Sequence, residues 1–296
     1  MMAPFKSGFI SILGRPNVGK STLFNRILGE KIAIVAEKPQ TTRNRILGIK
    51  KVEGGQLIFV DTPGIHEARS ELSQRIIRTA IASARGADVL SFIIEATSPL
   101  MEKDRQMIEY LKGSSGIPFL VINKIDLVKK ETLLPIIDQY QKLHPFQDII
   151  PISAITGEGI DVLLNQILKS LPESPPYYPE DMVTDQTERF WVSEVIREKV
   201  VQQSYQEIPY STAVTIEEYH EHPGKNLVVI KGTIHVERVS QKKIIIGKKG
   251  QMLRKIGEAA RKEVETFLGI RVFLELWVNV EKNWTHDPRA LNRLGY

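Results

Sequence analysis

The feature that most constrains the fold is an eight-residue run near the N-terminus, Gly14-Arg15-Pro16-Asn17-Val18-Gly19-Lys20-Ser21. It has the spacing of a P-loop, in which glycines and a Lys-Ser pair surround phosphate groups. An apolar segment at 9–13 precedes it and a helical pattern at 20–28 follows it, which is the context that a P-loop requires. The sequence therefore predicts that backbone N–H groups of this loop and the helix N-terminus bind phosphates.

Strand-like and helical patterns alternate along residues 1–174, which is typical of a mostly parallel sheet with helices on both faces. We expect strands at 9–13, 45–52, 56–60, 88–94, 119–122 and 149–152, and helices at 20–28, 71–85, 103–112, 131–143 and 160–171. The Glu53-Gly54-Gly55 turn predicts an antiparallel hairpin at the sheet edge. The predicted fold class is an α/β P-loop NTPase.

A proline-rich stretch separates this pattern from the rest of the chain. Four prolines lie within residues 172–179, and such a run cannot continue a helix and is typical of a stiff linker. A chain of 296 residues is also long enough for two cores. We therefore predict a nucleotide-binding domain at 1–174, a linker at 175–182, and a second domain with a C-terminal tail at 183–296.

The second domain has an α+β pattern: a helix, two strands, two helices and a strand. Residues 228–236 place alternate side chains on one apolar face, and we expect a half-buried antiparallel sheet there. Residues 272–280 alternate in the same way. The short loop Gly247-Lys248-Lys249-Gly250 stands before an amphipathic helix.

The chemistry of three side chains indicates the phosphate end of the predicted site. Lys20 supplies a point charge for the β and γ phosphate oxygens, and the Ser21 hydroxyl is a ligand for Mg²⁺. Asp61 follows an apolar strand, where an α/β sheet binds its ligand, and we expect it to hold Mg²⁺ through a water. The predicted phosphate-binding set is Gly14, Arg15, Pro16, Asn17, Val18, Gly19, Lys20, Ser21, Thr22, Asp61, Thr62, Pro63 and Gly64, with the Gly64 N–H at the γ-phosphate.

A second motif, Asn123-Lys124-Ile125-Asp126, indicates which base is bound. The Asp126 carboxylate can accept two N–H bonds from the N1 and N2 edge of guanine, whereas adenine offers no such pair of donors. Ser153 and Ala154 follow the last strand, as in a loop whose backbone N–H contacts guanine O6. The predicted base-binding residues are Asn123, Lys124, Asp126, Ser153 and Ala154.

A polar, aperiodic stretch at 39–43 is the expected place for a switch loop. We expect Thr42 to complete the Mg²⁺ shell in the triphosphate state, which makes Thr42 a catalytic residue together with Lys20 and Gly64. The alternative is a plain surface loop.

These motifs together, and the pattern of the second half, resemble the Era family of bacterial GTPases over essentially the whole chain. The resemblance implies GTP hydrolysis with Mg²⁺ as cofactor. Ile65 stands where Ras-like enzymes carry a glutamine that orients the attacking water, so hydrolysis must proceed differently. Some relatives with an apolar residue there use K⁺ bound by the P-loop asparagine, which implies that Asn17 is a K⁺ ligand and a catalytic residue.

The second domain resembles a type II KH domain, in which a GxxG loop clamps about four nucleotides of RNA backbone. Residues 238–262 contain nine basic residues and one acidic residue, so positive charge is focused near this loop. The predicted RNA-binding residues are Ile245, Ile246, Gly247, Lys248, Lys249, Gly250, Arg254 and Lys255, with bases packed beside the edge of strand 228–236. We expect Trp277 to be a rim residue, and the tail at 284–296 to pack on the domain or touch RNA.

By the same resemblance, the RNA is the 3′ region of 16S ribosomal RNA and the process is assembly of the small (30S) ribosomal subunit. We expect a cytoplasmic monomer, and the resemblance adds peripheral contact with the inner face of the cell membrane.

Two alternative functions stay open. One is an RNA-binding assembly protein whose nucleotide site is merely structural. The other is a small-molecule P-loop kinase, which would need an acceptor pocket with a catalytic base and would leave Asp126 unexplained.

Overall fold

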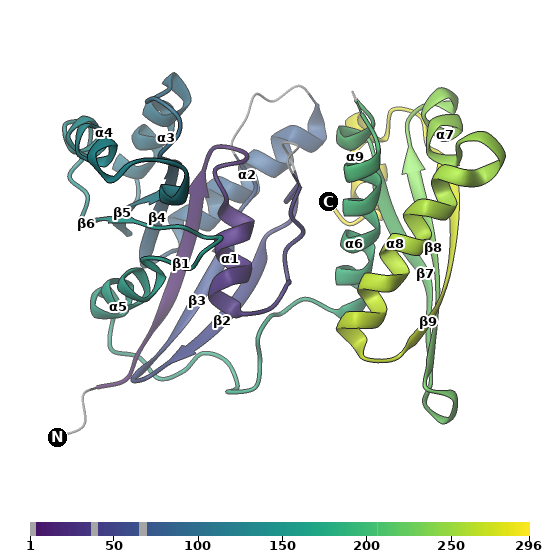
Figure 1. Cartoon of the computed structure of the whole chain (residues 1–296), viewed down its shortest axis with the longest axis horizontal. Coiled ribbons are helices and arrows are strands. Elements are labelled where there is room, and N and C mark those ends of the chain that lie inside the picture. The colour runs from purple at the N-terminus through teal and green to yellow at the C-terminus, as the bar shows by residue number, and fades with distance from the viewer. Residues whose placement is uncertain (1–3, 37–40, 65–69, 206) are drawn as a thin grey trace. The chain divides into compact units, whose positions relative to one another are not determined.

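The computed structural model describes residues 4–36, 41–64, 70–205 and 207–296 (Figure 1). Its contacts divide the chain into two compact units. The first comprises Met1–Ala33, Thr42–Ala68 and Ser73–Asp185, and the second comprises Ile34–Thr41, Arg69–Leu72 and Gln186–Tyr296. The second unit therefore includes two short segments from the N-terminal half of the chain.

The first unit is built on a six-stranded sheet with the order β2-β3-β1-β4-β5-β6. Its strands are β1 (Lys6–Gly14), β2 (Ile46–Val52), β3 (Gly55–Asp61), β4 (Val89–Glu95), β5 (Ile117–Asn123) and β6 (Asp148–Pro151). Neighbouring strands are parallel except for β2, which pairs antiparallel with β3 at the sheet edge. The six strands and the edge hairpin predicted from the sequence are confirmed.

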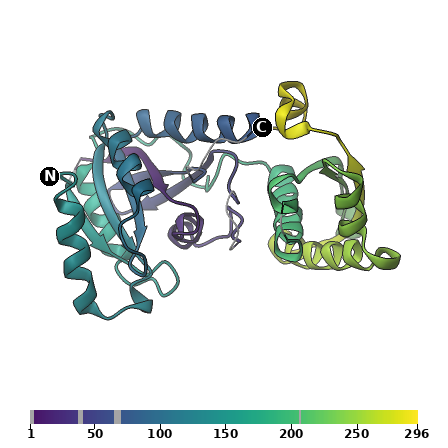
Figure 2. The same cartoon turned by 90° about the horizontal axis from the view of Figure 1, so that it is seen from above.

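Helices cover both faces of this sheet, and Figure 2 shows α1 and α2 on opposite sides of it. The helices are α1 (Lys20–Leu28), α2 (Glu71–Arg85), α3 (Glu102–Lys112), α4 (Leu133–Gln141) and α5 (Ile160–Ser170). Every residue of β3 is buried, as expected for a strand covered on both faces. Within the described ranges, no helix has the length and apolarity needed to cross a bilayer.

The strand directions bring the predicted motifs to one edge of the sheet. The P-loop follows β1, Asp61 ends β3, and Asn123 ends β5. Because these strands are parallel, their carboxyl ends lie side by side, and the register pairs Ile12 of β1 with Asp61 of β3. The fold therefore gathers residues that are more than a hundred positions apart in the sequence into one candidate site.

The segment predicted as a linker is held against the hairpin of the first unit. Gln56 Nε2 donates to the carbonyl of Tyr178 (2.8 Å), and the Phe9 and Tyr177 rings lie 5.3 Å apart. Further along, Ile49 N–H donates to the carbonyl of Val183 (2.7 Å). The contacts accordingly group the chain with the first unit as far as Asp185.

The second unit contains a three-stranded sheet with the order β7-β8-β9 and three main helices. Its elements are α6 (Glu188–Gln203), β7 (Ala213–His222), β8 (Leu227–Val236), α7 (Val239–Ile246), α8 (Gln251–Leu268) and β9 (Arg271–Val280). The predicted element order is confirmed. The expected antiparallel sheet is found only for β7 and β8, because the two-helix crossover returns β9 parallel to β8.

The core of the second unit lies between one face of this sheet and the helices. Val228, Ile230, Ile234 and Val236 of β8 are all buried there, which confirms the predicted alternation. They pack in one cluster with the apolar side of α6, including Val195, and with residues of α8. Side chains on the other face of the sheet lie outside this core.

The C-terminal tail packs on the second unit and so takes one of the two roles expected for it. Trp284 is fully buried, and its Nε1 donates to the carbonyl of Ser211 (3.1 Å). The Thr285 hydroxyl donates to Glu237 (2.6 Å). A short helix, α9 (Pro288–Arg293), then buries Leu291.

Candidate functional site

The P-loop bends sharply around the start of α1. Gly19 has φ 97°, and a Cβ at this position would collide with the side-chain amide of Asn123. Glycine is therefore required here for two reasons, the left-handed backbone and the close approach of another loop. Asn17, at the turn of the loop, also has a positive φ of 67°.

Lys20 points into the loop rather than into solvent. Its Nζ donates to the carbonyls of Gly14 (2.9 Å) and Arg15 (2.7 Å). Burial lowers the pKa of Lys20 to about 8, and the Asp61 charge partly opposes this effect. A buried ammonium that is held only by carbonyl groups has a strong electrostatic preference for an anion such as phosphate.

The three predicted magnesium ligands meet beside Lys20. Ser21 Oγ lies 2.9 Å from Asp61 Oδ2 and 2.9 Å from Thr42 Oγ1, and Thr42 Oγ1 donates to the same carboxylate oxygen at 3.1 Å. Burial raises the pKa of Asp61, while Lys20 and the two hydroxyls oppose the rise. Two hydroxyls and one carboxylate form the hard oxygen set that Mg²⁺ prefers.

The loop after Asp61 runs against the P-loop. The Thr62 hydroxyl donates to the carbonyl of Ile12 (2.6 Å), which ties β3 to β1 below the phosphate end of the site. A Cβ on Gly64 would meet Pro16 at 3.0 Å, so the Gly64 backbone lies next to the P-loop as expected for a γ-phosphate contact. The predicted Pro63 lies between them, and Ile65 is outside the described residues.

Asn123 joins the P-loop to the loop that follows the last strand. Its Nδ2 donates to the carbonyl of Val18 (2.8 Å), and its Oδ1 accepts the N–H of Ala154 (2.9 Å). The side chain is buried, so both ends of the amide are used inside the protein. Asn123 is therefore a brace between two loops in this structure, a role that the motif alone did not indicate.

The base end of the site is more open than the phosphate end. Asp126 is exposed and has no hydrogen-bond or ion-pair partner among the residues that the structure describes, so its carboxylate is available. Lys124, beside it, forms an ion pair with Glu95. Ser153 is buried and its hydroxyl accepts the N–H of Thr156 (3.1 Å), which shapes the facing loop. Guanine O6 would have to share the Ala154 N–H with Asn123.

Arg15 is anchored away from the phosphate end. Its guanidinium forms a buried ion pair with Asp104 of α3 (2.8 Å), and Asp104 in turn accepts a hydrogen bond from the Tyr140 hydroxyl (3.0 Å). The Arg15 side chain is thus engaged elsewhere, and only its backbone could serve the phosphate contact predicted for it. Thr22 lies in the first turn of α1, next to Ser21.

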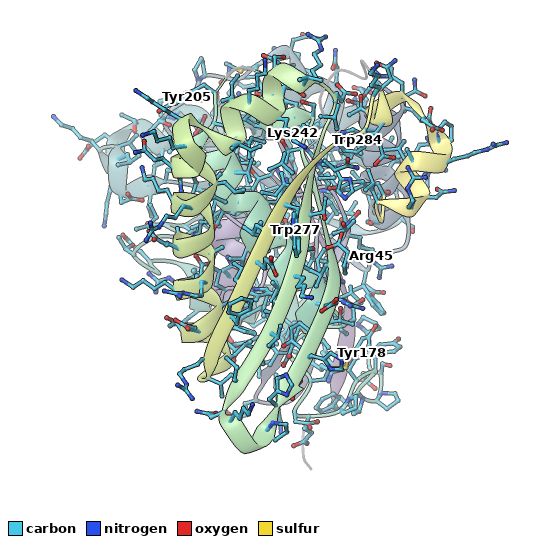
Figure 3. All side chains as sticks on the ribbon, turned by 90° about the vertical axis from the view of Figure 1, so that its right-hand side faces the viewer. Arg45, Tyr178, Tyr205, Lys242, Trp277 and Trp284 are labelled. Atoms are coloured by element: carbon cyan, nitrogen blue, oxygen red, sulfur yellow. The ribbon has the colours of Figure 1, made fainter. Side chains whose placement is uncertain are left out.

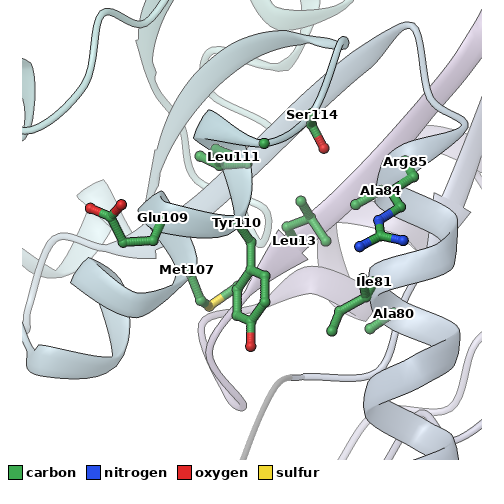
Figure 4. Close-up of a pocket in the computed structure, with 11 residues that line it drawn as sticks. Leu13, Ala80, Ile81, Ala84, Arg85, Met107, Glu109, Tyr110, Leu111 and Ser114 are labelled. Carbon is green, nitrogen blue, oxygen red and sulfur yellow. The ribbon is translucent and has the colours of Figure 1, made fainter.

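A separate cavity of about 140 Å³ lies between α2 and α3 (Figure 4). Its lining is mostly apolar, with Ile81, Met107 and Leu111 facing Tyr110 and with Arg85 and Glu109 among the polar residues. Leu13 near the end of β1 borders it, and none of the P-loop residues Gly14–Ser21 does. This cavity is therefore unsuited as the acceptor pocket that a P-loop kinase would need beside Lys20.

The segment before Thr42 belongs to the second unit. Val35 N–H donates to Glu198 of α6 (2.8 Å), and the fully buried Arg197 donates to the carbonyl of Thr41. Arg197 is also paired with Glu194 on the same helix. Thr42, the next residue along the chain, lies in the first unit with its hydroxyl on Asp61.

The GxxG loop has a backbone that only glycine allows at its first position. Gly247 has φ 73° and ψ 177°, and a Cβ there would meet the Cβ of Met252 at 2.7 Å. Lys248–Gly250 form a short 3₁₀ turn, in which Lys249 is left-handed, and α8 begins directly after it. The loop therefore projects its two lysines from a constrained turn.

A groove of about 360 Å³ leads from this loop along α8 and β9. Leu253 and Gly257 of α8 and Leu274 and Leu276 of β9 supply its apolar wall. The sequence-based expectation of bases beside the edge of strand 228–236 is wrong, because β8 is the central strand and both its edges are paired. The free edge beside α8 belongs to β9.

The predicted RNA-contacting isoleucines also need correction. Ile245 is only 1% exposed and lies in the core of the second unit, so its side chain cannot meet a base. Ile246 is half-buried, and Ile244, which was not predicted, is 52% exposed. The sequence run of three isoleucines does not reveal which of them the helix turns inward.

The predicted basic residues are exposed, as expected for a solvated phosphate-binding surface. Lys248, Lys249 and Lys255 form no ion pair with any residue that the structure describes. Arg254 pairs with Glu258 one turn further along α8 (2.9 Å), and both side chains are well exposed. Such a surface pair contributes little to stability, so Arg254 can exchange Glu258 for a phosphate at small cost.

Sequence reasoning missed Gly257 and the two leucines of β9 as groove residues. Gly257 interrupts an otherwise good helical sequence, and because glycine destabilises a helix, an isolated helical glycine often has a packing or functional reason. The signal was present in the sequence. Leu274 and Leu276 gave no such signal, because an apolar residue that alternates along a strand can face either the core or a groove.

Two family descriptions match this chain. Residues 9–124 match the family described as 50S ribosome-binding GTPase, and residues 207–285 match the KH domain family. The first match covers the P-loop, the Asp61 loop and the start of the base-binding motif. The second covers the GxxG loop and the groove beside α8.

The chain is similar over nearly its full length to proteins named GTPase Era. That of Syntrophus aciditrophicus is 55% identical over 292 residues, covering 99% of this chain and 95% of the relative. That of Geobacter metallireducens is 53% identical over 293 residues, with 99% and 98% covered. A crystal structure of Era with MgGDPNP and nucleotides 1506–1542 of 16S ribosomal RNA has a TM-score of 0.95 to this chain at 43% identity, covering 99% of both.

Proposed function

The chain belongs to the Era family of GTPases, and from this premise we propose that it is a GTP-hydrolysing switch that binds 16S ribosomal RNA through its KH domain during small-subunit assembly. The observation that carries the proposal is the cluster of Lys20, Ser21, Thr42 and Asp61 at the start of α1, in which all but the half-buried Ser21 are buried. Such a cluster is suited to bind phosphate and a divalent cation together.

Mg²⁺ fits this donor set. Asp61 Oδ1 is buried and has no hydrogen-bond partner among the described residues, so the carboxylate has unused acceptor capacity. Ser21 and Thr42 would hold the ion directly, and Asp61 through a water. When bound, the ion neutralises charge on the β and γ phosphate oxygens. Lys20 adds a second positive charge there, and the Gly64 N–H adds a neutral donor.

Guanine specificity is proposed to come from Asp126. Its exposed carboxylate can accept both donors of the guanine edge, and a xanthine base carries a carbonyl where guanine has its amino group. Asp126→Asn should therefore shift preference from guanosine to xanthosine nucleotides. Competition between GDP and xanthosine diphosphate measures this. Full retention of GTP selectivity by the variant would contradict the assignment.

Asn17 is proposed as the ligand of a K⁺ ion that stabilises charge during hydrolysis. Its left-handed position at the turn of the P-loop supports a carbonyl oxygen near the phosphates. GTP hydrolysis should then be faster in K⁺ than in Na⁺, and Asn17→Asp should remove the difference. Equal rates of the unaltered chain in both salts would rule out this role.

RNA binding is proposed to occur at the GxxG loop and the groove between α8 and β9. Exposed lysines on a constrained turn can clamp the RNA backbone, while the apolar wall at Leu253 and Leu276 accepts bases. The structural relative was solved with a 16S ribosomal RNA fragment, so the first probe is RNA of nucleotides 1506–1542. Crosslinking to cellular RNA, followed by sequencing, tests the choice of RNA independently.

The nucleotide is proposed to control RNA binding through residues 34–42. Within this stretch, Val35 and Thr41 are hydrogen-bonded to α6, and Thr42 is bonded to Asp61. RNA affinity measured with GDP and with a non-hydrolysable GTP analogue should therefore differ. Equal affinity in the two states would favour the alternative, an RNA-binding protein whose nucleotide site is merely structural.

Other properties implied by the family stay predictions. We infer that the chain is a monomer in the cytoplasm, that it binds the 30S subunit, and that it contacts the inner face of the cell membrane peripherally. Sedimentation of the purified chain tests the oligomeric state, and co-sedimentation with purified 30S subunits tests that partner. Cell fractionation at low and high salt tests the membrane contact.

A further inference from the structure

Strand β9 separates two different surfaces of the second unit. Its residues Leu274 and Leu276 line the groove beside α8, whereas Phe273 and Trp277 point to the other side of the strand, where they are 54% and 45% exposed. Figure 3 looks onto this open face of the sheet, with Trp277 labelled. The groove and the open face therefore adjoin along a single edge strand.

Trp277 differs from the other two tryptophans of the chain. Trp191 is 4% exposed and Trp284 is fully buried, and each packs in the interior of the second unit. Phe273 lies four residues before Trp277 on the same face, so about 13 Å separates two exposed aromatic rings along the strand. Two large aromatic side chains therefore stand on one uncovered sheet face, with Glu275 between them.

The surroundings of Trp277 offer hydrogen-bonding groups. Its cross-strand neighbour is Thr233, and Thr215 lies beyond it on β7. The Thr215 hydroxyl lies 2.8 Å from His235 Nε2 on the same face. Lys231, on the same face of β8, forms an ion pair with Glu218 at 2.9 Å, and Glu275 of β9 lies opposite Lys231. A flat apolar ring among polar groups suits an unpaired base, which has both a stacking face and polar edges.

A single RNA strand can reach this face directly from the groove. Leu276, which lines the groove, is followed at once by Trp277, and β9 is the edge strand, so no further strand lies between the two surfaces. Open sheets of other RNA-binding domains stack bases on exposed aromatic side chains in the same manner. Positive charge concentrated at the adjoining GxxG loop favours an RNA occupant over a protein segment.

We propose that Trp277 is a stacking platform for an unpaired base of the same RNA strand that occupies the groove, beyond the roughly four nucleotides held at the GxxG loop. This departs from the sequence-based expectation of a rim residue, and it rests on the proposed RNA-binding function. Stacking needs only the face of a base, so Trp277 extends the bound stretch of RNA without selecting its sequence.

Intrinsic fluorescence tests the proposal, because Trp277 is the exposed tryptophan and the other two are buried. The probes are RNA of nucleotides 1506–1542 and tetranucleotides that together cover its unpaired part, each added to the full chain. The long RNA should quench the emission and protect it from acrylamide. A tetranucleotide bound at the GxxG loop should do neither.

Substitution gives the second readout. Trp277→Ala should weaken binding of the long RNA about tenfold and leave tetranucleotide binding unchanged, while Trp277→Phe should stay within about threefold of the unaltered chain. Tyr110→Ala is the matched control, since Tyr110 is 47% exposed in the first unit. Thermal unfolding of each variant checks that the fold is retained.

The outcomes separate this inference from the proposed function. If Trp277→Ala binds the long RNA as the unaltered chain does, the platform is refuted while RNA binding at the groove stands. If that variant keeps RNA affinity but binds whole 30S subunits more weakly, the face contacts a protein and the proposal is again refuted. If the unaltered chain binds none of these RNAs, the proposed function fails and the platform fails with it.

Discussion

The nucleotide site and the GxxG loop differ in how their binding side chains are held. Those of the first are buried and fixed, and those of the second are exposed. At the nucleotide site, Lys20, Asp61 and Asn123 are buried, and each is hydrogen-bonded to groups of the P-loop or α1. At the loop, Lys248 and Lys249 are exposed and form no ion pair with described residues. A small ligand of fixed shape is met by fixed groups, and a long flexible polyanion by a shaped backbone with solvated charge.

This difference determines how each region should respond to substitution. In the buried network, a lost side chain leaves partners unsatisfied, so both stability and ligand binding change, with weak dependence on salt. At the exposed loop, stability should hardly change, and the loss of binding should depend strongly on salt. Substitutions in the two regions therefore test whether this difference holds.

The largest effect is expected for Lys20→Ala. The substitution removes the charge that is buried beside the phosphate end, and hydrolysis of GTP should fall by about 10³-fold or more, as for other single charge-stabilising groups. Triphosphate binding should weaken as well. Single-turnover hydrolysis with saturating protein measures the chemical step.

Lys51→Ala is the control for this loss, because Lys51 lies in the same unit and forms only an exposed pair with Glu180. Its rate should equal that of the unaltered chain. Near-normal turnover by Lys20→Ala would mean that the hydrolytic site lies elsewhere.

The next effect is expected for Asn123→Ala, which removes the brace between the P-loop and the loop that follows the last strand. The carbonyl of Val18 and the N–H of Ala154 would lose their buried partner. Each such loss costs about 1 to 3 kcal/mol, so the free energy of unfolding should fall by about 2 to 6 kcal/mol. Urea denaturation measures this, and GDP affinity should decrease in parallel. A variant as stable as the unaltered chain would show that the two loops hold together without Asn123.

A smaller effect, which should depend on the salt concentration, is expected for the double substitution Lys248→Asp and Lys249→Asp. RNA affinity should fall about tenfold to a hundredfold, because two charge-assisted phosphate contacts are lost. The slope of log affinity against log salt should decrease by about 1.4, which corresponds to two contacts with single-stranded RNA. Filter binding over a salt series measures both quantities.

The matched control carries the same change of charge on exposed residues of the first unit, Lys103→Asp and Lys129→Asp. It should keep the RNA affinity and the salt slope, and both doubly substituted chains should keep their affinity for GTP. Unchanged RNA binding after substitution at the GxxG loop would rule out this loop as the RNA-binding surface.

The same contrast explains how much of the molecule the sequence could predict. Motif residues that end strands, such as Asp61 and Asn123, were placed correctly, because parallel strands bring their carboxyl ends to one edge whatever the details of packing. The brace made by Asn123 could not be predicted, since it depends on the distance between two loops. Ile65, where hydrolysis was expected to differ from Ras-like enzymes, lies outside the described residues.

In the second unit, alternation predicted each strand but neither its direction nor its place in the sheet. A period of two residues is the same for parallel and antiparallel pairing, so the parallel β9 and the paired edges of β8 were missed. The choice of Ile245 over Ile244 failed for a related reason. Which isoleucine faces inward depends on the rotation of a short helix against the sheet, and three identical residues carry no signal for it.

The smallest effect is expected for Gly257→Ala. This substitution should raise stability and lower RNA affinity. Glycine inside a helix costs about 0.5 to 1 kcal/mol relative to alanine, so the substitution should stabilise the second unit by about that amount. A Cβ at this position would meet Leu276 Cδ1 at 3.6 Å, an ordinary contact that causes no strain. The same methyl group would, however, enter the groove between α8 and β9.

Gly257→Ala should therefore raise the melting temperature and weaken RNA binding about two- to fivefold at every salt concentration, because the groove is narrowed while its charge is unchanged. Thr266→Ala is the control, since Thr266 lies exposed further along α8 and does not line the groove. It should stabilise the helix without affecting RNA. A Gly257→Ala chain that is more stable and binds RNA at full affinity would show that the bases do not follow this groove, and would leave charge at the GxxG loop as the whole basis of recognition.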